Sequence, residues 1–142
     1  MQRPPRDGRP TTLPVGQLYG DPEREPSMGI EEPAIEPERF LEDVEMRVGE
    51  IVAAEAFPEA RKDVYKLDVD FGSETLRSAA GLTDNYTTDE LCGRQVLAVC
   101  NLGTVPIAGF ESECLVTGVD DADGDVVHLE PERAVENGTR VY

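Results

Sequence analysis

The pattern of apolar and polar positions predicts five strands and little helix. Residues 64–71 alternate between polar and apolar side chains, and residues 95–100 form an apolar run rich in valine. Both patterns are typical of strands with at least one buried face. The predicted strands are, in chain order, residues 44–57, 64–71, 74–80, 94–102 and 113–119. Gly49 interrupts the first strand and predicts a bend or bulge at that position.

Shorter elements complete the predicted topology. Residues 38–43 predict a helical turn, and residues 84–91 predict a short helix with Thr87 or Thr88 as its N-cap. Residues 126–129 and 140–142 predict short terminal strands. Three strands, a short helix and two further strands follow the order of an OB-fold, a partly open barrel. We therefore predict an all-β fold: a five-stranded OB-fold barrel with one short helix between its third and fourth strands.

The first 38 residues differ from the rest. They hold eight of the eleven prolines, and their apolar residues follow no period. Proline lacks the backbone donor that helices and sheets need, and a segment without an apolar face cannot bury one. We predict a disordered, proline-rich tail over residues 1–38 and the OB-fold domain over residues 39–142.

Charge is the strongest compositional signal. The chain has 30 acidic and 13 basic residues, a formal net charge of −17, and only two of the bases are lysines. This balance is typical of intracellular proteins of salt-in halophiles and suggests a haloarchaeal origin. An ordinary acidic protein and an acidic disordered chain are the alternatives. No apolar run is long enough to span a bilayer, and arginines and prolines interrupt the N-terminus. We predict a cytoplasmic protein without membrane insertion.

Catalytic and metal chemistry find little support. His128 is the single histidine and lies in a strand-like run, and no phosphate-binding glycine motif is present. The spacing of Cys92, Cys100 and Cys114 fits no zinc site, and a disulfide is unexpected inside the cell. The acidic run 120–125 lacks the terminal glutamate of a calcium loop and predicts a solvated turn. We predict a protein that is not an enzyme and has no cofactor or metal.

Nucleic-acid binding has a better candidate surface. OB-folds bind oligonucleotides across strands two and three and the adjoining loops. The side chains predicted to lie there and to bind are Arg61, Lys62, Lys66, Arg77, Ser78, Asn101 and Ser112. Candidate platforms for base stacking are Phe57, Tyr65 and Phe110. A structural role is the alternative for each: the aromatic residues would belong to the core, and Arg61 and Lys62 to a solvated loop.

The ordered landmarks of the last hundred residues resemble a known family. The landmarks are Gly81-Leu82, Tyr86 to Leu91, Gly93-Arg94, Val99 to Leu102 and Ser112-Glu113, and they extend upstream through residues 43–51 and 57–62. They resemble the tRNA-binding domain appended to some methionyl-tRNA synthetases, which also occurs as a free-standing dimeric protein and as the CsaA-type export chaperone. The resemblance implies tRNA as the partner, basic contacts by Arg61, Lys62, Lys66 and Arg77, and a homodimer. The loop 103–109, where the family usually has a basic residue, has none.

Two further functions stay open. Similarity to the CsaA-like branch implies an export chaperone that binds unfolded preproteins, with residues 105–110 lining an apolar groove. The domain is alternatively an accessory that delivers tRNA to a separate aminoacyl-tRNA synthetase. We expect tRNA recognition through the shape and unpaired elements of the RNA.

Overall fold

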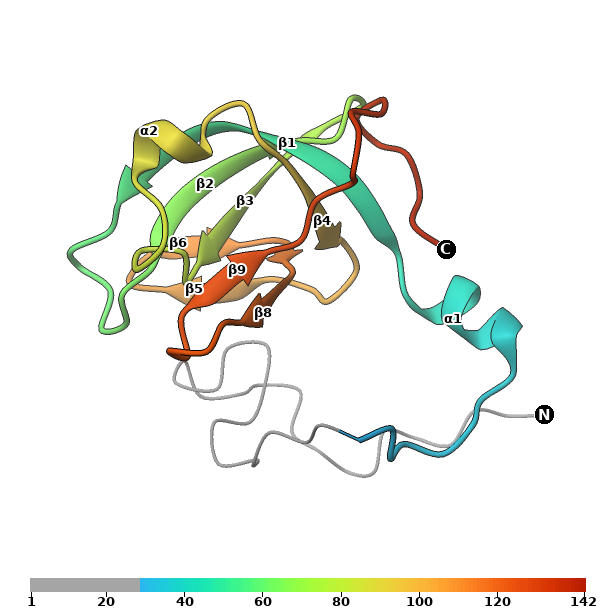
Figure 1. Ribbon diagram of the computed structural model, residues 1–142. Helices are drawn as coiled ribbons and strands as arrows, with labels where there is room; N and C mark the ends of the chain where they lie inside the picture. Colours follow the sequence, from blue (N-terminus) through green and yellow to red (C-terminus); the bar gives the residue numbers. More distant parts are fainter. Residues whose placement is uncertain (1–28) are drawn as a thin grey trace. The chain divides into compact units, whose positions relative to one another are not determined.

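A five-stranded antiparallel sheet curls into a nearly closed barrel in the computed structural model, which describes residues 29–142 (Figure 1). The sheet order is β3-β2-β1-β4-β7. Its strands are β1 (Met46–Ala56), β2 (Tyr65–Asp70), β3 (Thr75–Ala80), β4 (Gln95–Val99) and β7 (Leu115–Val116). This arrangement confirms the predicted OB-like barrel.

Strand β1 links the two halves of the barrel. Its first half pairs with β4 from Met46 to Glu50, and its second half pairs with β2 from Glu50 to Ala56. The register shifts between Ile51 and Ala53, so Val52 forms the bulge. The bulge was predicted at Gly49, three residues too early. Because a bulge bends and twists its strand, it lets β1 serve both halves of the barrel.

Backbone and side-chain hydrogen bonds close the barrel between β3 and residues 112–114, which lead into β7. Glu113 N donates to Arg77 O at 2.8 Å, and the Ser78 hydroxyl donates to Cys114 O at 2.8 Å. Ala79 N donates to the Ser112 hydroxyl at 3.0 Å. We call these three contacts the seam of the barrel.

Two hairpins extend from the barrel. One is formed by β5 (Val105–Ile107) and β6 (Phe110–Ser112), and the other by β8 (Gly118–Asp120) and β9 (Val126–His128). The first hairpin begins in the predicted loop 103–109 and continues into residues 110–112, where no strand was predicted. The predicted fifth strand is divided between β7 and β8. Residues 140–142 form no strand, and an isolated bridge joins Arg47 to Arg140.

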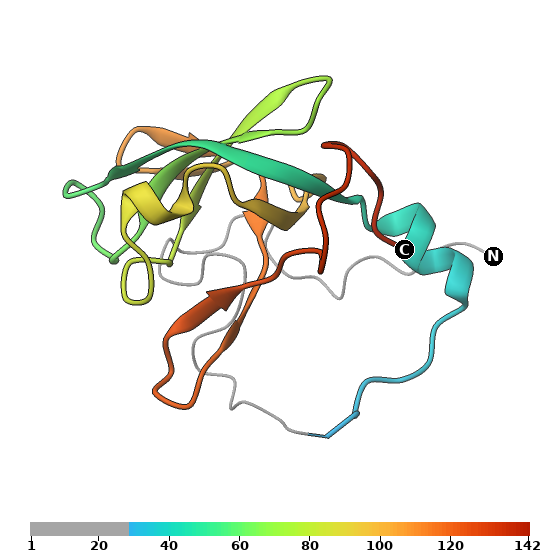
Figure 2. The same ribbon diagram turned by 45° about the horizontal axis from the view of Figure 1, so that its top comes forward.

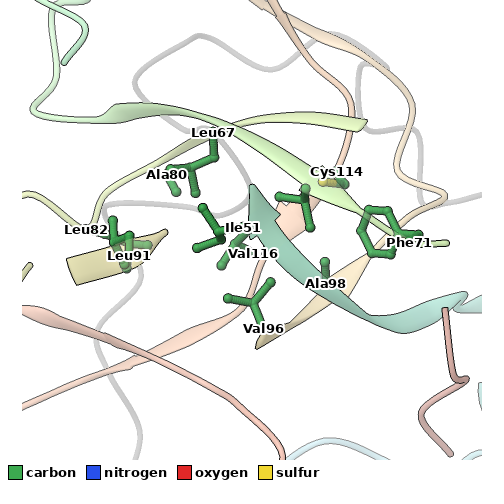
Figure 3. Packing of buried hydrophobic residues seen from close by; sticks show 11 residues of the cluster. Ile51, Leu67, Phe71, Ala80, Leu82, Leu91, Val96, Ala98, Cys114 and Val116 are labelled. Carbon is green, nitrogen blue, oxygen red and sulfur yellow. The ribbon is translucent and has the colours of Figure 1, made fainter. Parts of the chain in front are cut away.

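The core lies inside the barrel (Figure 3). Ile51, Leu67 and Val96 are 0% exposed. The short helix α2 (Thr88–Leu91) adds Leu91, which is also fully buried. Thr87 is the N-cap of α2, since its side chain accepts from Glu90 N and the Glu90 carboxylate accepts from Thr87 N. This capping box fixes where the helix begins.

Helix α1 (Pro37–Asp43) precedes the barrel and has no buried residue. The C-terminal segment runs beside the start of β1, where Val141 N donates to Met46 O at 2.8 Å, and the Arg140 guanidinium donates to Leu41 O at the end of α1. Figures 1 and 2 both show the C-terminus close to α1. Residues 1–28 of the predicted tail lie outside the described residues. Within residues 29–142, no helix is long and apolar enough to cross a membrane.

Candidate nucleic-acid interface

Two phenylalanine rings meet on the outer side of the barrel. Phe57 follows the last residue of β1, and Phe110 is the first residue of β6. Their ring centroids are 5.5 Å apart with an interplanar angle of 67°, an edge-to-face contact. Phe57 is 6% exposed and Phe110 is half-buried. The pair therefore joins the loop after β1 to the β5–β6 hairpin.

Two cations lie over this aromatic pair. Lys66 Nζ is 4.9 Å from the Phe57 centroid and 5.9 Å from that of Phe110. The Arg77 guanidinium carbon is 5.6 Å from the Phe110 centroid. These distances are within the range of cation–π attraction, about 0.5–1 kcal/mol at exposed sites. We call Phe57, Lys66, Arg77 and Phe110 the aromatic–cation cluster.

Strand register explains why both cations reach the same rings. Lys66 is on β2 and Arg77 on β3, and Asp68 is the residue directly opposite Arg77. Side chains alternate between the faces of a strand, so Lys66, Asp68 and Arg77 share the outer face. Diagonal neighbours on one face are close enough for long side chains to meet. The sheet therefore holds Lys66 and Arg77 in fixed relative positions.

The loop between β1 and β2 adds two exposed bases, Arg61 and Lys62. A backbone hydrogen bond from Ala60 N to Phe57 O at 3.2 Å turns the chain at the start of this loop. The loop then returns through the buried Val64 to Tyr65 and Lys66. Four of the predicted bases thus belong to one loop and the adjoining sheet face.

Carboxylates lie among these bases. Glu55 Oε1 is 3.1 Å from Lys66 Nζ, and Glu113 Oε1 accepts a hydrogen bond from Arg77 N at 2.9 Å. The Glu113 contact uses the backbone of Arg77 and leaves the exposed guanidinium outside it. The sequence reading missed the pairing of Glu55 with Lys66, because the bulge at Val52 sets the register that brings them together.

Four predicted residues have structural contacts instead of an exposed position. Phe57 is 6% exposed and packs edge-to-face against Phe110. Ser78 and Ser112 are 0% exposed, and both hydroxyls belong to the seam. Tyr65 packs on the core, and its hydroxyl donates to Tyr86 O at 2.8 Å. Phe110 is thus the ring that reaches the surface within the cluster.

Asn101 lies apart from the cluster. Its amide nitrogen donates to Asp43 O, and its amide oxygen accepts from Glu45 N, each at 2.9 Å. These contacts are just before β1, whereas Phe57 follows the other end of the same strand. Asn101 therefore ties α1 to the end of β4 and is not brought together with the other predicted residues.

The contacts of His128 and of the acidic turn 120–125 stabilise the fold. His128 is 5% exposed, and its ring is tilted against Tyr86 with the centroids 5.0 Å apart. In the turn, Asp121 Oδ1 accepts from Asp123 N at 2.9 Å and from Asp125 N at 3.0 Å. The bond from Asp125 N is the main cause that lowers the pKa of Asp121. These bonds account for the carboxylates of Asp121, Asp123 and Asp125 lying close together.

The apolar segment 105–110 folds into the β5–β6 hairpin, with Ile107 buried and Pro106 exposed. A cavity of about 280 Å³ lies elsewhere and is lined by polar as well as apolar side chains. Its lining residues are Glu45, Arg47, Phe71, Ser73, Glu74, Leu76, Cys100 and Gly138. None of these belongs to the hairpin, so the cavity is not the groove predicted for an apolar peptide.

Comparison with known proteins shows which proteins this chain resembles. The family model described as "Putative tRNA binding domain" matches residues 46–140. Methionine–tRNA ligase of Methanocaldococcus jannaschii is 33% identical over 102 residues, which is 72% of this chain and 16% of the ligase. The ligase of Chlorobium chlorochromatii is 38% identical over 109 residues, or 77% of this chain and 15% of that protein. The chain thus corresponds to a small part of the length of these ligases.

Solved structures of two related proteins have a similar fold. The chaperone CsaA of Bacillus anthracis has a TM-score of 0.70 and 36% identity, covering 77% of this chain and 100% of CsaA. The methionyl-tRNA-synthetase-related protein of Pyrococcus horikoshii has a TM-score of 0.69 and 29% identity, with 78% and 100% covered. The matched segment contains the whole barrel, both hairpins and the aromatic–cation cluster. The chain therefore belongs to the tRNA-binding domain family, with CsaA-like proteins among its structural neighbours.

Proposed function

We propose that this protein binds tRNA through the outer face of β2 and β3 and the loop 57–64, without catalysing a reaction. The observation that carries the proposal is the aromatic–cation cluster, in which Phe110 supports Lys66 and Arg77 on one face. Membership of the tRNA-binding domain family supports the choice of ligand.

The mechanism follows from the chemistry of the face. Lys66, Arg77 and the loop bases Arg61 and Lys62 bind phosphates, which position an RNA without reading its sequence. The half-buried ring of Phe110 offers an apolar contact for an unpaired base. Ser78 and Ser112 support the face by closing the seam, and the proposal does not use Asn101, whose amide is committed to α1 and β1.

Charge-reversal substitutions test whether this face binds tRNA. Arg61→Glu and Arg77→Glu, singly and together, are expected to weaken tRNA binding measured by fluorescence anisotropy. Arg133→Glu is the matched control, because Arg133 pairs with its neighbour Glu132 and its side chain is 83% exposed. Equal weakening by Arg133→Glu would show that total charge, rather than this face, governs binding.

Binding of unfolded polypeptide is the second candidate. The specific observation in its favour is the match to CsaA at 36% identity over the full length of that chaperone. A reduced, denatured polypeptide added to the tRNA complex separates the two functions. Displacement of tRNA would indicate one shared site, whereas retention of the polypeptide without any tRNA binding would favour the chaperone.

We also propose that the protein forms a homodimer in the cytoplasm and that it associates with an aminoacyl-tRNA synthetase. Exposed apolar side chains on and near α1 support the homodimer. Phe40 and Leu41 on α1 are 37% and 43% exposed. Leu102, which follows the residue that bonds to Asp43 O of α1, is 44% exposed. Sedimentation equilibrium should give twice the mass of one chain, and Leu41→Glu should reduce it to one. Association with a synthetase is tested by co-sedimentation with purified methionyl-tRNA synthetase.

A further inference from the structure

The outer face of the sheet opposes each of its two cations with a carboxylate. Glu55 on β1 is directly opposite Lys66 on β2, and Asp68 on β2 is directly opposite Arg77 on β3. Directly opposed side chains of an antiparallel pair have Cβ atoms about 4.5–5.5 Å apart. The proposed phosphate-binding face therefore contains its own anions, in register with its cations.

The two cations differ in how they are held. Lys66 Nζ is 3.1 Å from Glu55 Oε1 and lies over Phe57 and Phe110, and its side chain is 28% exposed. Among the described residues, no ion pair joins Arg77 to Asp68, and Arg77 lies over the Phe110 ring instead. Arg77 is thus open to a phosphate, whereas Lys66 is already bound to a carboxylate.

Glu55 is placed so that a ligand can displace it. Its side chain is 69% exposed, so the carboxylate can turn into solvent and be hydrated after it leaves Lys66. Exposed ion pairs contribute only about 0.2–1 kcal/mol. Lys66 remains in place after the exchange because the two rings and the strand still hold it.

We propose that Glu55 is a competing anion built into the RNA-binding face, which occupies Lys66 until a phosphodiester of the ligand replaces it. The inference rests on the proposed tRNA-binding function and adds a residue that determines specificity. An isolated phosphate gains little from Lys66, because it must expel Glu55 for one contact. A polyanion already bound to Arg61, Lys62 and Arg77 presents its next phosphate at high effective concentration and wins the exchange.

The variant Glu55→Gln tests this role, because glutamine keeps the size of the side chain and removes the competing charge. We expect the affinity for tRNA to rise about two- to fivefold at low salt. We also expect the slope of log K against log salt to stay the same, because a phosphate contacts Lys66 in both complexes and the number of phosphate contacts does not change. Glu130→Gln is the matched control, since it removes an equal charge from an exposed residue that lies outside β1, β2 and β3.

A double-mutant cycle with Lys66→Gln separates the possible failures. The gain from Glu55→Gln should vanish in the Lys66→Gln background, because there is then no cation to release. A gain that persists there, or one that Glu130→Gln reproduces, would overturn the role of Glu55 while leaving tRNA binding intact. Absence of tRNA binding by the unmodified protein at low salt would overturn both proposals. Thermal unfolding of each variant checks that the fold is retained.

Discussion

Gly49 lies where two core side chains leave no room for a methyl group. A Cβ built on Gly49 would be 2.5 Å from Val69 Cγ1 and 2.8 Å from Phe71 Cε1. The requirement for glycine is steric here, since close packing rather than an unusual backbone angle excludes other residues. The bulge predicted at Gly49 was wrong, because glycine in a strand can also mark the close approach of another group.

The substitution Gly49→Ala is expected to lower the free energy of unfolding by about 1–3 kcal/mol, the usual cost of overpacking. Urea unfolding followed by circular dichroism measures the change. Gly81→Ala is the control, because a Cβ there would meet only Asp63 O at 3.9 Å, an ordinary contact. A loss at Gly81 as large as that at Gly49 would contradict the steric explanation.

The three thiols are expected to differ in reactivity. Cys92 is exposed, whereas burial raises the pKa of Cys100 to about 11 and that of Cys114 to about 12. Because the thiolate is the reactive form, a thiol reagent at pH 8 should label the exposed Cys92 quickly, the partly buried Cys100 slowly and the buried Cys114 only after unfolding. Cys92→Ser should remove the fast reaction. Equal labelling rates for all three cysteines would contradict the burial of Cys100 and Cys114.

The same pKa values make stability depend on alkaline pH. Unfolding returns both thiols to their ordinary pKa of 9.0, so the unfolded chain loses protons that the folded chain keeps. Stability is therefore full below pH 9 and falls as the pH rises from there through 11 towards 12. Urea unfolding at pH 8 and 10 measures the fall, and Cys100→Ala with Cys114→Ala should make it smaller. An unchanged fall in that double variant would assign it to other groups.

At the scale of elements, the β5–β6 hairpin is important because it carries Phe110. Its turn consists of Ala108 and Gly109, both with positive φ, 47° and 83°. Positive φ at both central residues is the geometry of a type I′ turn, which favours Asn-Gly. Alanine in this conformation costs roughly 1–2 kcal/mol. The hairpin therefore stores a local strain at its exposed tip.

The substitution Ala108→Asn should relieve this strain and raise the free energy of unfolding by about 0.5–1 kcal/mol, since asparagine tolerates the left-handed region. Thermal unfolding monitored by calorimetry measures the gain. Ala122→Asn is a control on another exposed turn where φ is not positive. An equal gain at Ala122 would assign the effect to surface polarity rather than to the turn.

The elements that follow a clear apolar period were predictable, and those that depend on tertiary contacts were not. Residues 64–71 alternate, so β2 and its inward and outward faces could be predicted. The β5–β6 hairpin was missed because Pro106 argues against a strand, yet proline is tolerated at an edge position. Ser78 was predicted on the binding surface, although it shares the parity of Leu76 and Ala80 and strand alternation places it inward, opposite to Arg77. Its partner at the seam, Cys114, depends on barrel closure and has no local signal.

At the scale of the whole molecule, the formal charge of −17 opposes folding in dilute buffer. The ion pairs within residues 29–142 include Lys66 with Glu55 and Arg39 with Asp43, and bases are too few to pair most of the carboxylates. Repulsion among the remaining acids must be screened by salt, since the Debye length is about 3 Å at 1 M and about 30 Å at 0.01 M.

The melting temperature is therefore expected to rise from dilute buffer to molar KCl, by about 4–8 °C for each kcal/mol of repulsion removed. Calorimetry in a KCl series measures it. Sucrose at equal osmolality is the control, because it stabilises by exclusion without screening charge. Equal melting temperatures in 0.01 M and 1 M KCl would contradict an adaptation to salt.

The contact between the C-terminal segment and the start of β1 brings the two ends of the barrel domain side by side. Val141 N bonds to Met46 O, so the chain leaves the barrel beside the point where it entered. A unit with adjacent entry and exit points can be joined to another protein, or inserted within one, without stretching its own strands. Joining residue 142 to residue 37 by a short glycine linker and opening the chain in the exposed turn at Gly124 should therefore yield a circular permutant with the same barrel.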